Sequence, residues 1–343
     1  MGWDIRATAA CAAAMSLALV SRASAAPPTA LAAPFAPAIE TLADKLLANY
    51  LFPEVGRQYA ETLRRRLAAG DYDHTADAQQ IAAQLTADLQ AIRKDGHLRV
   101  RVVDAAPSSA TRASASAPPP VTDAKWLAPG VAYIAFSLMP DDPQVVSAVE
   151  RFMREHASAR VVIIDARQNH GGGEGVPNAI FKYLFAKPRV LTYFDERTGV
   201  EDDTTDDPYE QPPVITKAPG PAGVSRSRFT VTPDASEHRL FRAKVFYLTS
   251  AKTASAAEQM AQTLKRTHRG LIIGERTAGA GHFGFFVPIG QGLEAFIPWG
   301  RVLDAATGDD YEGRGVAPDV VVPADRALDE ALRRAAPRGG SGD

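Results

Sequence analysis

Cysteine is almost absent from this sequence of 343 residues. The one cysteine, Cys11, lies inside an N-terminal segment that we expect to be removed. A mature chain without cysteine excludes disulfide bonds, thiol catalysis and cysteine-ligated metal sites. No pair of histidines has the helical spacing of a metal site either. We therefore expect an activity that needs no metal and no organic cofactor.

An excess of charge of either sign is also missing. The chain has 38 basic and 40 acidic residues, a net charge of −2, and no long basic block. Binding to nucleic acid or to an anionic membrane usually relies on a basic patch. The charge therefore indicates neither of these partners.

Long apolar runs are confined to the first residues. Arg6 precedes an apolar run over residues 7–20, which is followed by Ala23-Ser24-Ala25. This run is too short to span a bilayer, and it ends at a small-residue cleavage motif, as in a secretory signal peptide. We predict a signal peptide over residues 1–25, cleaved after Ala25, and a periplasmic or secreted product without a membrane span. A buried N-terminal helix is the alternative.

Helical periodicity dominates the next part of the chain. After a Pro/Ala linker over residues 26–37, apolar residues recur on one face of three successive segments. The last of these segments stops at Asp95-Gly96. Residues 38–97 are therefore predicted to form a small helical domain of about three amphipathic helices.

From residue 98 to 335 short apolar runs alternate with helical stretches. The runs at 161–164, 245–248 and 271–273 are continuous, which is typical of a parallel sheet covered on both faces. Strand and helix alternation predicts an α/β core.

Two segments of this core lack such periodicity. Residues 104–125 are rich in Ala, Ser and Pro and are predicted to be a flexible connection, while 199–238 are acidic, then Pro-rich, and are predicted to be a loop or flap. Residues 336–343 are expected to form a disordered tail.

Ser255 is the first candidate for chemistry. It follows a buried strand and opens a predicted helix, where free backbone N–H groups and the helix dipole favour developing negative charge. However, Ser255 and Glu258 also fit the S-x-x-E capping box, which is a structural device. The pattern alone leaves both interpretations open.

A glycine-rich loop is the second candidate. The sequence runs from Asp165 through Arg167 and Asn169 to Gly171-Gly172-Gly173, directly after a buried strand. Glycines there let backbone amides approach a ligand, as an oxyanion hole requires. Asp165 and Arg167 are placed to brace the loop by an ion pair. The spacing matches neither a phosphate-binding loop nor a dinucleotide fingerprint, and a plain glycine turn is the alternative.

Two further positions offer a base and its partner. His97 follows Asp95-Gly96, and histidine is the usual base for activating a serine. Glu312 lies in a late Gly-rich segment and is a candidate to orient a base. The simpler alternatives are a histidine beside a helix C-cap glycine and a solvated turn.

Taken together, these motifs resemble the C-terminal-processing (tail-specific) serine peptidase family. The match is best to its branch similar to the repeats of interphotoreceptor retinoid-binding protein and to the tricorn core. It covers about residues 38–332. The motifs occur in the family's order: D-G-H at 95–97, D-x-R-x-N-x-G-G at 165–172, T-x-S-A-A-E at 253–258, G-E-x-T-x-G at 274–279 and E-G-x-G-V-x-P-D at 312–319.

The resemblance implies a crotonase-like (ClpP/crotonase-type) α/β core behind the helical domain, and it implies site residues. Ser255 falls on the family's nucleophile. The oxyanion hole would be the amide of Ala256 with one from Gly171 or Gly172. His97 would be the general base, Glu312 a polarising or positioning residue, and His282 a reserve base.

Two features depart from the processing branch. That branch pairs its serine with a lysine 25 residues later, where this chain has Ala280. It also carries a PDZ domain before the glycine loop, and the 26 residues between Val103 and Gly130 leave no room for one. We therefore expect a histidine base, no PDZ domain, and a contribution of the 199–238 segment to substrate contact.

The expected function is hydrolysis of peptide bonds in a peptide or unfolded protein substrate, through an acyl-enzyme on Ser255. The main alternative is a non-catalytic module that binds apolar ligands on the same fold, as the retinoid-binding relatives do. The family's tendency to oligomerise also leaves a homo-oligomer or an assembly role open.

Overall fold

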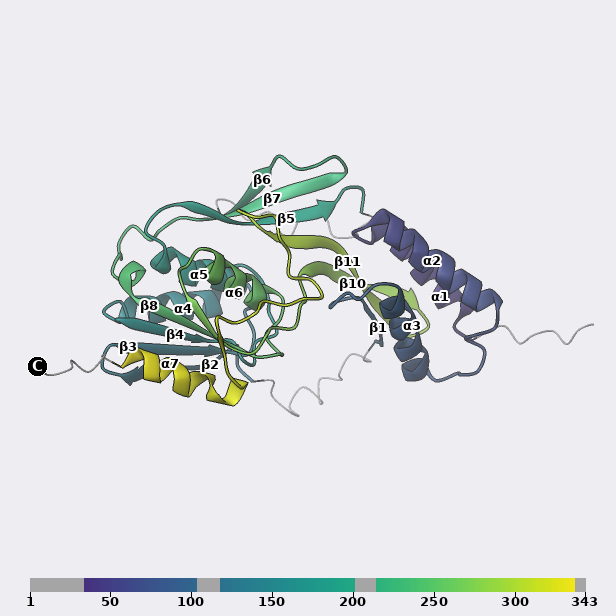
Figure 1. The fold of residues 1–343 in the computed structure, drawn as a ribbon. Coiled ribbons are helices and arrows are strands. Elements are labelled where there is room, and N and C mark those ends of the chain that lie inside the picture. The colour runs from purple at the N-terminus through teal and green to yellow at the C-terminus, as the bar shows by residue number, and fades with distance from the viewer. Residues whose placement is uncertain (1–33, 104–117, 201–213, 337–343) are drawn as a thin grey trace, which may run out of the picture. The chain divides into compact units, whose positions relative to one another are not determined.

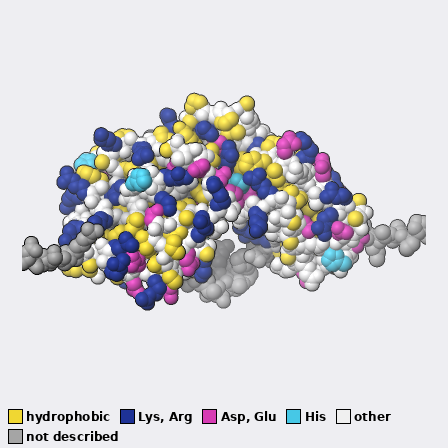
Figure 2. Space-filling view, in the orientation of Figure 1, with side chains coloured by type: hydrophobic (Ala, Val, Ile, Leu, Met, Phe, Trp, Pro, Cys, Tyr) yellow, Lys and Arg dark blue, Asp and Glu magenta, His cyan; other side chains and the backbone are white. Residues whose placement is uncertain are grey.

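The computed structural model describes residues 34–103, 118–200 and 214–336. The predicted signal peptide, most of the Pro/Ala linker and nearly all of the predicted tail lie outside these ranges. Within them no helix has the length and apolarity needed to cross a membrane. On the face seen in Figure 2, basic and acidic side chains are interspersed, in keeping with the near-neutral composition.

Three helices form the N-terminal region: α1 (Ala36–Asn49), α2 (Pro53–Ala68) and α3 (Ala78–Ile92). Pro53 begins α2 at the position where a missing N–H costs nothing. Asp77 caps α3 by accepting the N–H groups of Gln79 and Gln80, at 2.7 and 3.1 Å. The apolar faces of these helices share one core with three strands, β1 (Arg99–Val102), β10 (His282–Gly290) and β11 (Leu293–Asp304). The helical region therefore packs on the sheet to which these strands belong.

One six-stranded sheet has the order β12-β9-β8-β4-β3-β2. Its strands are β2 (Val121–Ala128), β3 (Val131–Phe136), β4 (Val161–Asp165), β8 (Lys244–Thr249), β9 (Leu271–Gly274) and β12 (Val320–Val321). All neighbours pair in parallel except β2 with β3. This is the parallel core that the continuous apolar runs predict.

Helices cover both faces of this sheet (Figure 1). Alternate residues of the strands pack on α4 (Pro143–Glu155), α5 (Gly175–Leu184) and α6 (Ala256–Arg266) on one face. The intervening residues pack on α7 (Ala327–Ala335) on the other face. Because both faces are buried, the strands read as continuous apolar runs rather than as alternating ones.

A second sheet is antiparallel, with the order β1-β11-β5-β7-β6, and β10 also pairs with β11. Its strands are β1 (Arg99–Val102), β5 (Arg189–Arg197), β6 (Ile215–Ala218), β7 (Val224–Val231), β10 (His282–Gly290) and β11 (Leu293–Asp304). Two short 3-10 helices, η2 (Leu240–Arg242) and η3 (Ala324–Arg326), complete the described elements.

The segment 199–238, predicted as a loop or flap, contains two strands of this sheet. β6 and β7 pair with each other, and β7 pairs with β5. In β7 the residues Ser227, Phe229 and Val231 are buried in alternation. This alternation is short and follows an acidic, Pro-rich stretch, so the composition of the segment predicted a loop instead of strands. Residues 201–213 lie outside the described ranges. Likewise β2 begins at Val121, inside the connection predicted over 104–125.

Candidate active site

Ser255 is the residue that precedes α6, and its backbone is unusual. It has φ 55° and ψ −125°, a region that residues with a side chain seldom occupy. The S-x-x-E capping box is present through the carboxylate of Glu258, which accepts the Ser255 N–H at 3.0 Å. The Glu258 N–H bonds to the Ser255 carbonyl oxygen at 2.8 Å. The Ser255 hydroxyl occupies the capping-box position next to the Glu258 N–H but forms no hydrogen bond of normal geometry with it. The hydroxyl is therefore only loosely engaged by the cap.

The buried carboxylate of Glu258 accepts four hydrogen bonds, whereas the sequence analysis predicted only its capping-box contact with Ser255. Besides Ser255 its carboxylate accepts the Thr277 hydroxyl at 2.5 Å and the N–H groups of Gly279 and Ala280 at 2.7 and 2.8 Å. Burial raises the pKa of Glu258, against the hydrogen bonds that lower it. The motif T-x-G at 277–279, found but not assigned a role, was the signal for this contact.

The glycine loop comes close to Ser255. A Cβ added to Gly171 would lie 2.6 Å from the Ser255 Cβ, and one on Gly172 would lie 2.0 Å from the Met139 carbonyl oxygen. Both glycines have positive φ, 97° and 144°. No other residue type fits these two positions without moving its neighbours.

The two glycine amides considered as partners of the Ala256 amide in the oxyanion hole are not equivalent. The Gly171 N–H donates to Asn169 Oδ1 at 2.7 Å, so it is already engaged. Within the described ranges the N–H groups of Gly172 and Ala256 have no acceptor. Gly172 forms a parallel bridge with Met139, so its own N–H points away from Met139. Gly172 with Ala256 is thus the pair that remains available.

Asp165, Arg167 and Asn169 stabilise the glycine loop through an ion pair and hydrogen bonds. Arg167 forms an ion pair with Asp165 at 2.6 Å and donates to the Ala324 carbonyl oxygen at 2.8 Å. The Asn169 carbonyl oxygen accepts the N–H of Ala254, at 3.1 Å, which joins the glycine loop to the residue before Ser255.

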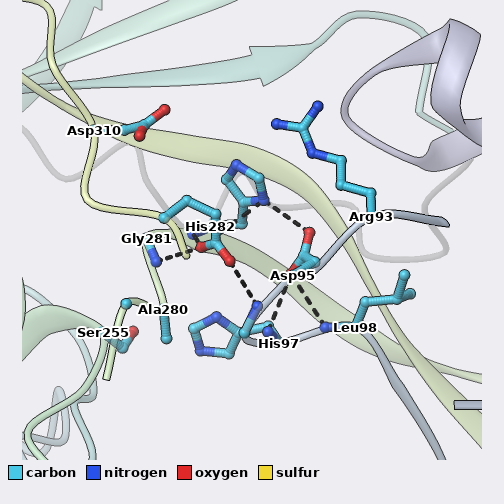
Figure 3. A network of polar contacts seen from close by, with 12 residues as sticks. Arg93, Asp95, His97, Leu98, Ser255, Ala280, Gly281, His282 and Asp310 are labelled. Carbon is cyan, nitrogen blue, oxygen red and sulfur yellow. Dashed lines mark hydrogen bonds and ion pairs between the residues drawn. The ribbon is translucent and has the colours of Figure 1, made fainter. Parts of the chain in front are cut away.

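His97 lies in the turn between α3 and β1, with its N–H bonded to Asp95 Oδ1 at 3.1 Å. Its ring packs on Phe296, with centroids 5.3 Å apart, and extends toward the side of the site where Ser255 and Ala280 lie (Figure 3). Burial lowers the pKa of His97 to about 4, against the opposing charge of Asp95. The ring is therefore neutral at pH 7, and no hydrogen bond joins it to Ser255 among the described residues.

Glu312 bonds to backbone rather than to the His97 ring. Its carboxylate accepts the N–H groups of Gly96 and Gly281, both at 2.6 Å, and of His282, at 2.9 Å. Burial raises its pKa. Glu312 therefore joins the turn that carries His97 to the start of β10.

His282 is fully buried. Its Nδ1 lies 2.7 Å from Asp95 Oδ2, which also accepts the Tyr50 hydroxyl at 2.9 Å. Burial acts to raise the pKa of Asp95, but the hydrogen bond and charge of His282 outweigh it, so this pKa lies below its usual value. Its Nε2 is buried and has no partner within the described ranges. The reserve base is thus enclosed, away from any substrate.

Asp95, His282 and Glu312 also offer ligand atoms within 4.8 Å of one another. The carboxylate oxygens of Asp95 and Glu312 already accept N–H and O–H groups, so a metal ion would have to displace these donors.

Glu174 is a buried carboxyl that the sequence analysis did not identify. It follows the glycine loop, directly before α5, and accepts Gln259 Nε2 at 3.0 Å. Burial raises the pKa of Glu174 to about 8, so its neutral form prevails at pH 7. Its only sequence signal is its place after the glycines.

Ala280 occupies the position of the lysine in the processing branch. It is buried, and a Cβ added to Gly96 would lie 2.9 Å from its Cα. The turn carrying His97 therefore rests against the segment that Glu258 ties to Ser255.

Comparison with known proteins identifies the family of this chain. The family model of peptidase family S41 matches residues 130–322. The model of the N-terminal domain of S41 peptidases in eukaryotic IRBP matches residues 29–130.

Solved structures share the fold at low identity. A putative peptidase from Parabacteroides merdae is 16% identical, with 91% of this chain and 99% of that chain covered and a TM-score of 0.62. The photosystem II D1 C-terminal processing protease is 16% identical, with 88% and 98% covered and a TM-score of 0.53. A lipoprotein from Streptococcus agalactiae is 13% identical, with 87% and 94% covered and a TM-score of 0.52.

Proposed function

We propose how this chain, which belongs to peptidase family S41 and is a serine-type peptidase, carries out its reaction: Ser255 attacks the peptide carbonyl and His97 moves the proton. The observation that carries this proposal is the strained Ser255 at the start of α6, with a hydroxyl only loosely engaged by the cap beside two unengaged amides. Such strain at an exposed turn is typical of functional sites.

In the first step the Ser255 Oγ–carbon bond forms while His97 takes the hydroxyl proton. The negative charge on the carbonyl oxygen is stabilised by the N–H groups of Ala256 and Gly172 and by the α6 dipole. His97 then gives its proton to the leaving amine as the C–N bond breaks. Water repeats the sequence and releases the acid from the acyl-enzyme.

His97 rather than His282 is the base in this proposal. His97 is only half-buried, neutral at pH 7 and directed toward the Ser255 side of the site. His282 has its Nδ1 engaged by Asp95 and its Nε2 enclosed. Since catalytic hydrogen bonds are often long before substrate binds, substrate binding is proposed to bring His97 to the Ser255 hydroxyl.

Glu312 is proposed as a positioning residue for His97. It holds the Gly96 amide and thereby the turn that presents the imidazole. This role acts through the backbone and is the positioning alternative of the two roles, polarising or positioning, that the resemblance implies.

The core is proposed to be crotonase-like and to lack a PDZ domain. Only residues 103–120 separate β1 from β2, fewer than an independent domain needs. Export is proposed from the signal-like residues 1–25, with a peptide or unfolded protein as substrate outside the cytoplasm.

Labelling with a fluorophosphonate probe tests this mechanism. We expect labelling of the full chain to be abolished in Ser255→Ala and to slow by about a hundredfold or more in His97→Ala, since a general base contributes that much. His238→Ala, an exposed histidine outside the site, serves as the matched control and is expected to label normally.

Labelling of His97→Ala at the wild-type rate would exclude His97 as base. No labelling of the wild type would instead favour the alternative of a non-catalytic module for apolar ligands.

A further inference from the structure

Arg99 begins β1, two residues after the proposed base, which lies in the turn before that strand. The His97 ring and the Arg99 guanidinium both contact the ring of Phe296. The neighbours Leu98 and Val100 face the helices and belong to their core. Arg99 therefore lies on the opposite face of β1, with Phe286 of β10 and Phe296 of β11. We call this the outer face.

The guanidinium of Arg99 is held between two aromatic rings. Its central carbon lies 5.0 Å from the Phe286 ring centroid and 5.3 Å from that of Phe296, the ring on which His97 packs. Its Nη1 donates to the His97 carbonyl oxygen at 3.1 Å. These contacts fix the position of the charge beside the base.

No carboxylate neutralises Arg99 within residues 34–103, 118–200 and 214–336. Its neighbour Arg101 differs, because it forms an ion pair with Glu294 at 2.6 Å. Among the described residues, Glu294 is therefore engaged by Arg101, and no second carboxylate is paired with Arg99. Burial, and then the charge of Arg101, lowers the pKa of Arg99, which shows that this cation is held in an unfavourable setting.

A second arginine, Arg93, lies apart from the outer face. It stacks on Phe52 at 4.3 Å, a residue that packs against the helical core, and extends toward His282 (Figure 3). It too has no ion-pair partner among the described side chains.

A half-buried guanidinium with unused donors is suited to one kind of ligand. Its planar fork matches a carboxylate, and such charge-assisted bonds are stronger than neutral ones. Because Arg99 lies two residues from the proposed base, a carboxylate carried by the substrate is the ligand that this position favours.

We infer that Arg99 is a specificity-determining residue, which binds a carboxylate of the substrate close to the scissile bond. This inference rests on the proposed function of Ser255 and names its substrate class: peptides with an acidic side chain near the cleaved bond. A gain in affinity that depends only on a free C-terminus would overturn it.

Peptide binding to Ser255→Ala separates recognition from chemistry. The probes are one fluorescent peptide with Gln at each position flanking the expected scissile bond, and its matched forms with Glu at one position each. A further pair has a free or an amidated C-terminus. We expect one acidic form to bind about ten- to a hundredfold more tightly than its neutral match, the range for a hydrogen bond to a charged group. The form that gains affinity tells a side-chain carboxylate from a terminal one.

Variants of Arg99 in the same background assign this gain. Arg99→Gln is expected to remove the preference while neutral peptides bind within twofold of before, and Arg99→Lys to keep part of it. Arg101→Gln changes the neighbouring arginine on the same face, which already has its acid partner, and is expected to leave the preference unchanged.

Equal binding of acidic and neutral peptides to the parent would overturn the inference, as would an equal loss for both in Arg99→Gln. Turnover by the protein with its serine intact is measured in parallel. A clear acidic preference in binding without any turnover would refute the proposed peptidase mechanism and leave the carboxylate site standing.

Discussion

At the level of single residues, different interactions fix the backbone conformation of the proposed nucleophile and the protonation state of the proposed base. Ser255 is held in a strained backbone conformation by two hydrogen bonds. Its N–H donates to the Glu258 carboxylate at 3.0 Å, and its carbonyl oxygen accepts the Tyr311 hydroxyl at 3.2 Å. His97 is instead prepared by burial, which keeps its imidazole neutral. A neutral imidazole is ready to accept a proton throughout the physiological range.

The lowered pKa of His97 predicts an unusual acid limit of activity. The rate of fluorophosphonate labelling, which requires the unprotonated ring, should stay level from pH 8 down to about 5 and fall with a midpoint near pH 4. An ordinary histidine would give a midpoint near 6.5. The measurement is the labelling rate against pH, with circular dichroism at each pH to separate titration from unfolding. A midpoint at 6 or above would contradict the role assigned to burial.

At the level of elements, two buried glutamates hold loops that come from distant parts of the chain. Glu258 in α6 binds the turn at 277–280, and Glu312 binds the turns before β1 and before β10. Four donors converge on Glu258 and three on Glu312. Each carboxylate replaces the water that these backbone groups would otherwise need.

Glu258→Gln is predicted to be strongly destabilising. An amide offers one acceptor oxygen, and its NH₂ group would face donors such as the Gly279 and Ala280 N–H groups. Buried donors left without an acceptor cost about 1–3 kcal/mol each, so we expect a loss of at least 2 kcal/mol in the free energy of unfolding, measured by urea denaturation. Labelling of Ser255 should fall with it.

The surface substitution Glu54→Gln on α2 is the control for this change. It affects only an exposed ion pair with Arg57, so its urea midpoint should match that of the wild type. Equal urea midpoints for the two variants would show that the hydrogen bonds of Glu258 do not contribute to the free energy of unfolding.

The sequence predicts elements better than it predicts these contacts. The parallel strands and the three N-terminal helices follow from apolar periodicity, which depends only on local spacing and burial. Glu258 accepts the Thr277 hydroxyl, 19 positions away, and the backbone N–H groups of Gly279 and Ala280, 21 and 22 positions away. The motif around Thr277 marks the segment, but backbone donors exist at nearly every residue, so the sequence does not show which of them the carboxylate will meet.

The same limit explains the site at His97 and His282. Motif order placed both histidines near the site, but their difference depends on Asp95, whose Oδ2 takes His282 and whose Oδ1 takes the His97 amide. That choice is made by the packing of α1 and α3 on β10 and β11, which has no local signature in the sequence.

At the level of the whole molecule, stability should depend on pH through Glu174. Its pKa is about 8 in the folded chain and near 4.5 when unfolded. Between these values the native state holds a proton that the unfolded state has released, so stability declines as pH rises from about 4.5 through 8.

Glu174→Gln is predicted to remove this decline. The variant should match the wild type near pH 4.5 and exceed it by a few kcal/mol at pH 8, since each pKa unit corresponds to about 1.4 kcal/mol. Urea unfolding at both pH values measures this. A constant difference between variant and wild type at the two pH values would mean that Glu174 does not titrate in the fold.

The pairing of β1 with β11 has a consequence for the folding of this peptidase during its synthesis. Residues 99–102 pair with 293–296, and in the described chain β1 has no other strand partner. The turn that carries His97 is synthesised long before Ser255, yet the strand that follows it, β1, has no partner strand until β11 has been synthesised. Because such distant pairing must wait for nearly the whole chain, a nascent polypeptide that ends before β11 carries the proposed nucleophile and base without the strand pairing that positions the base.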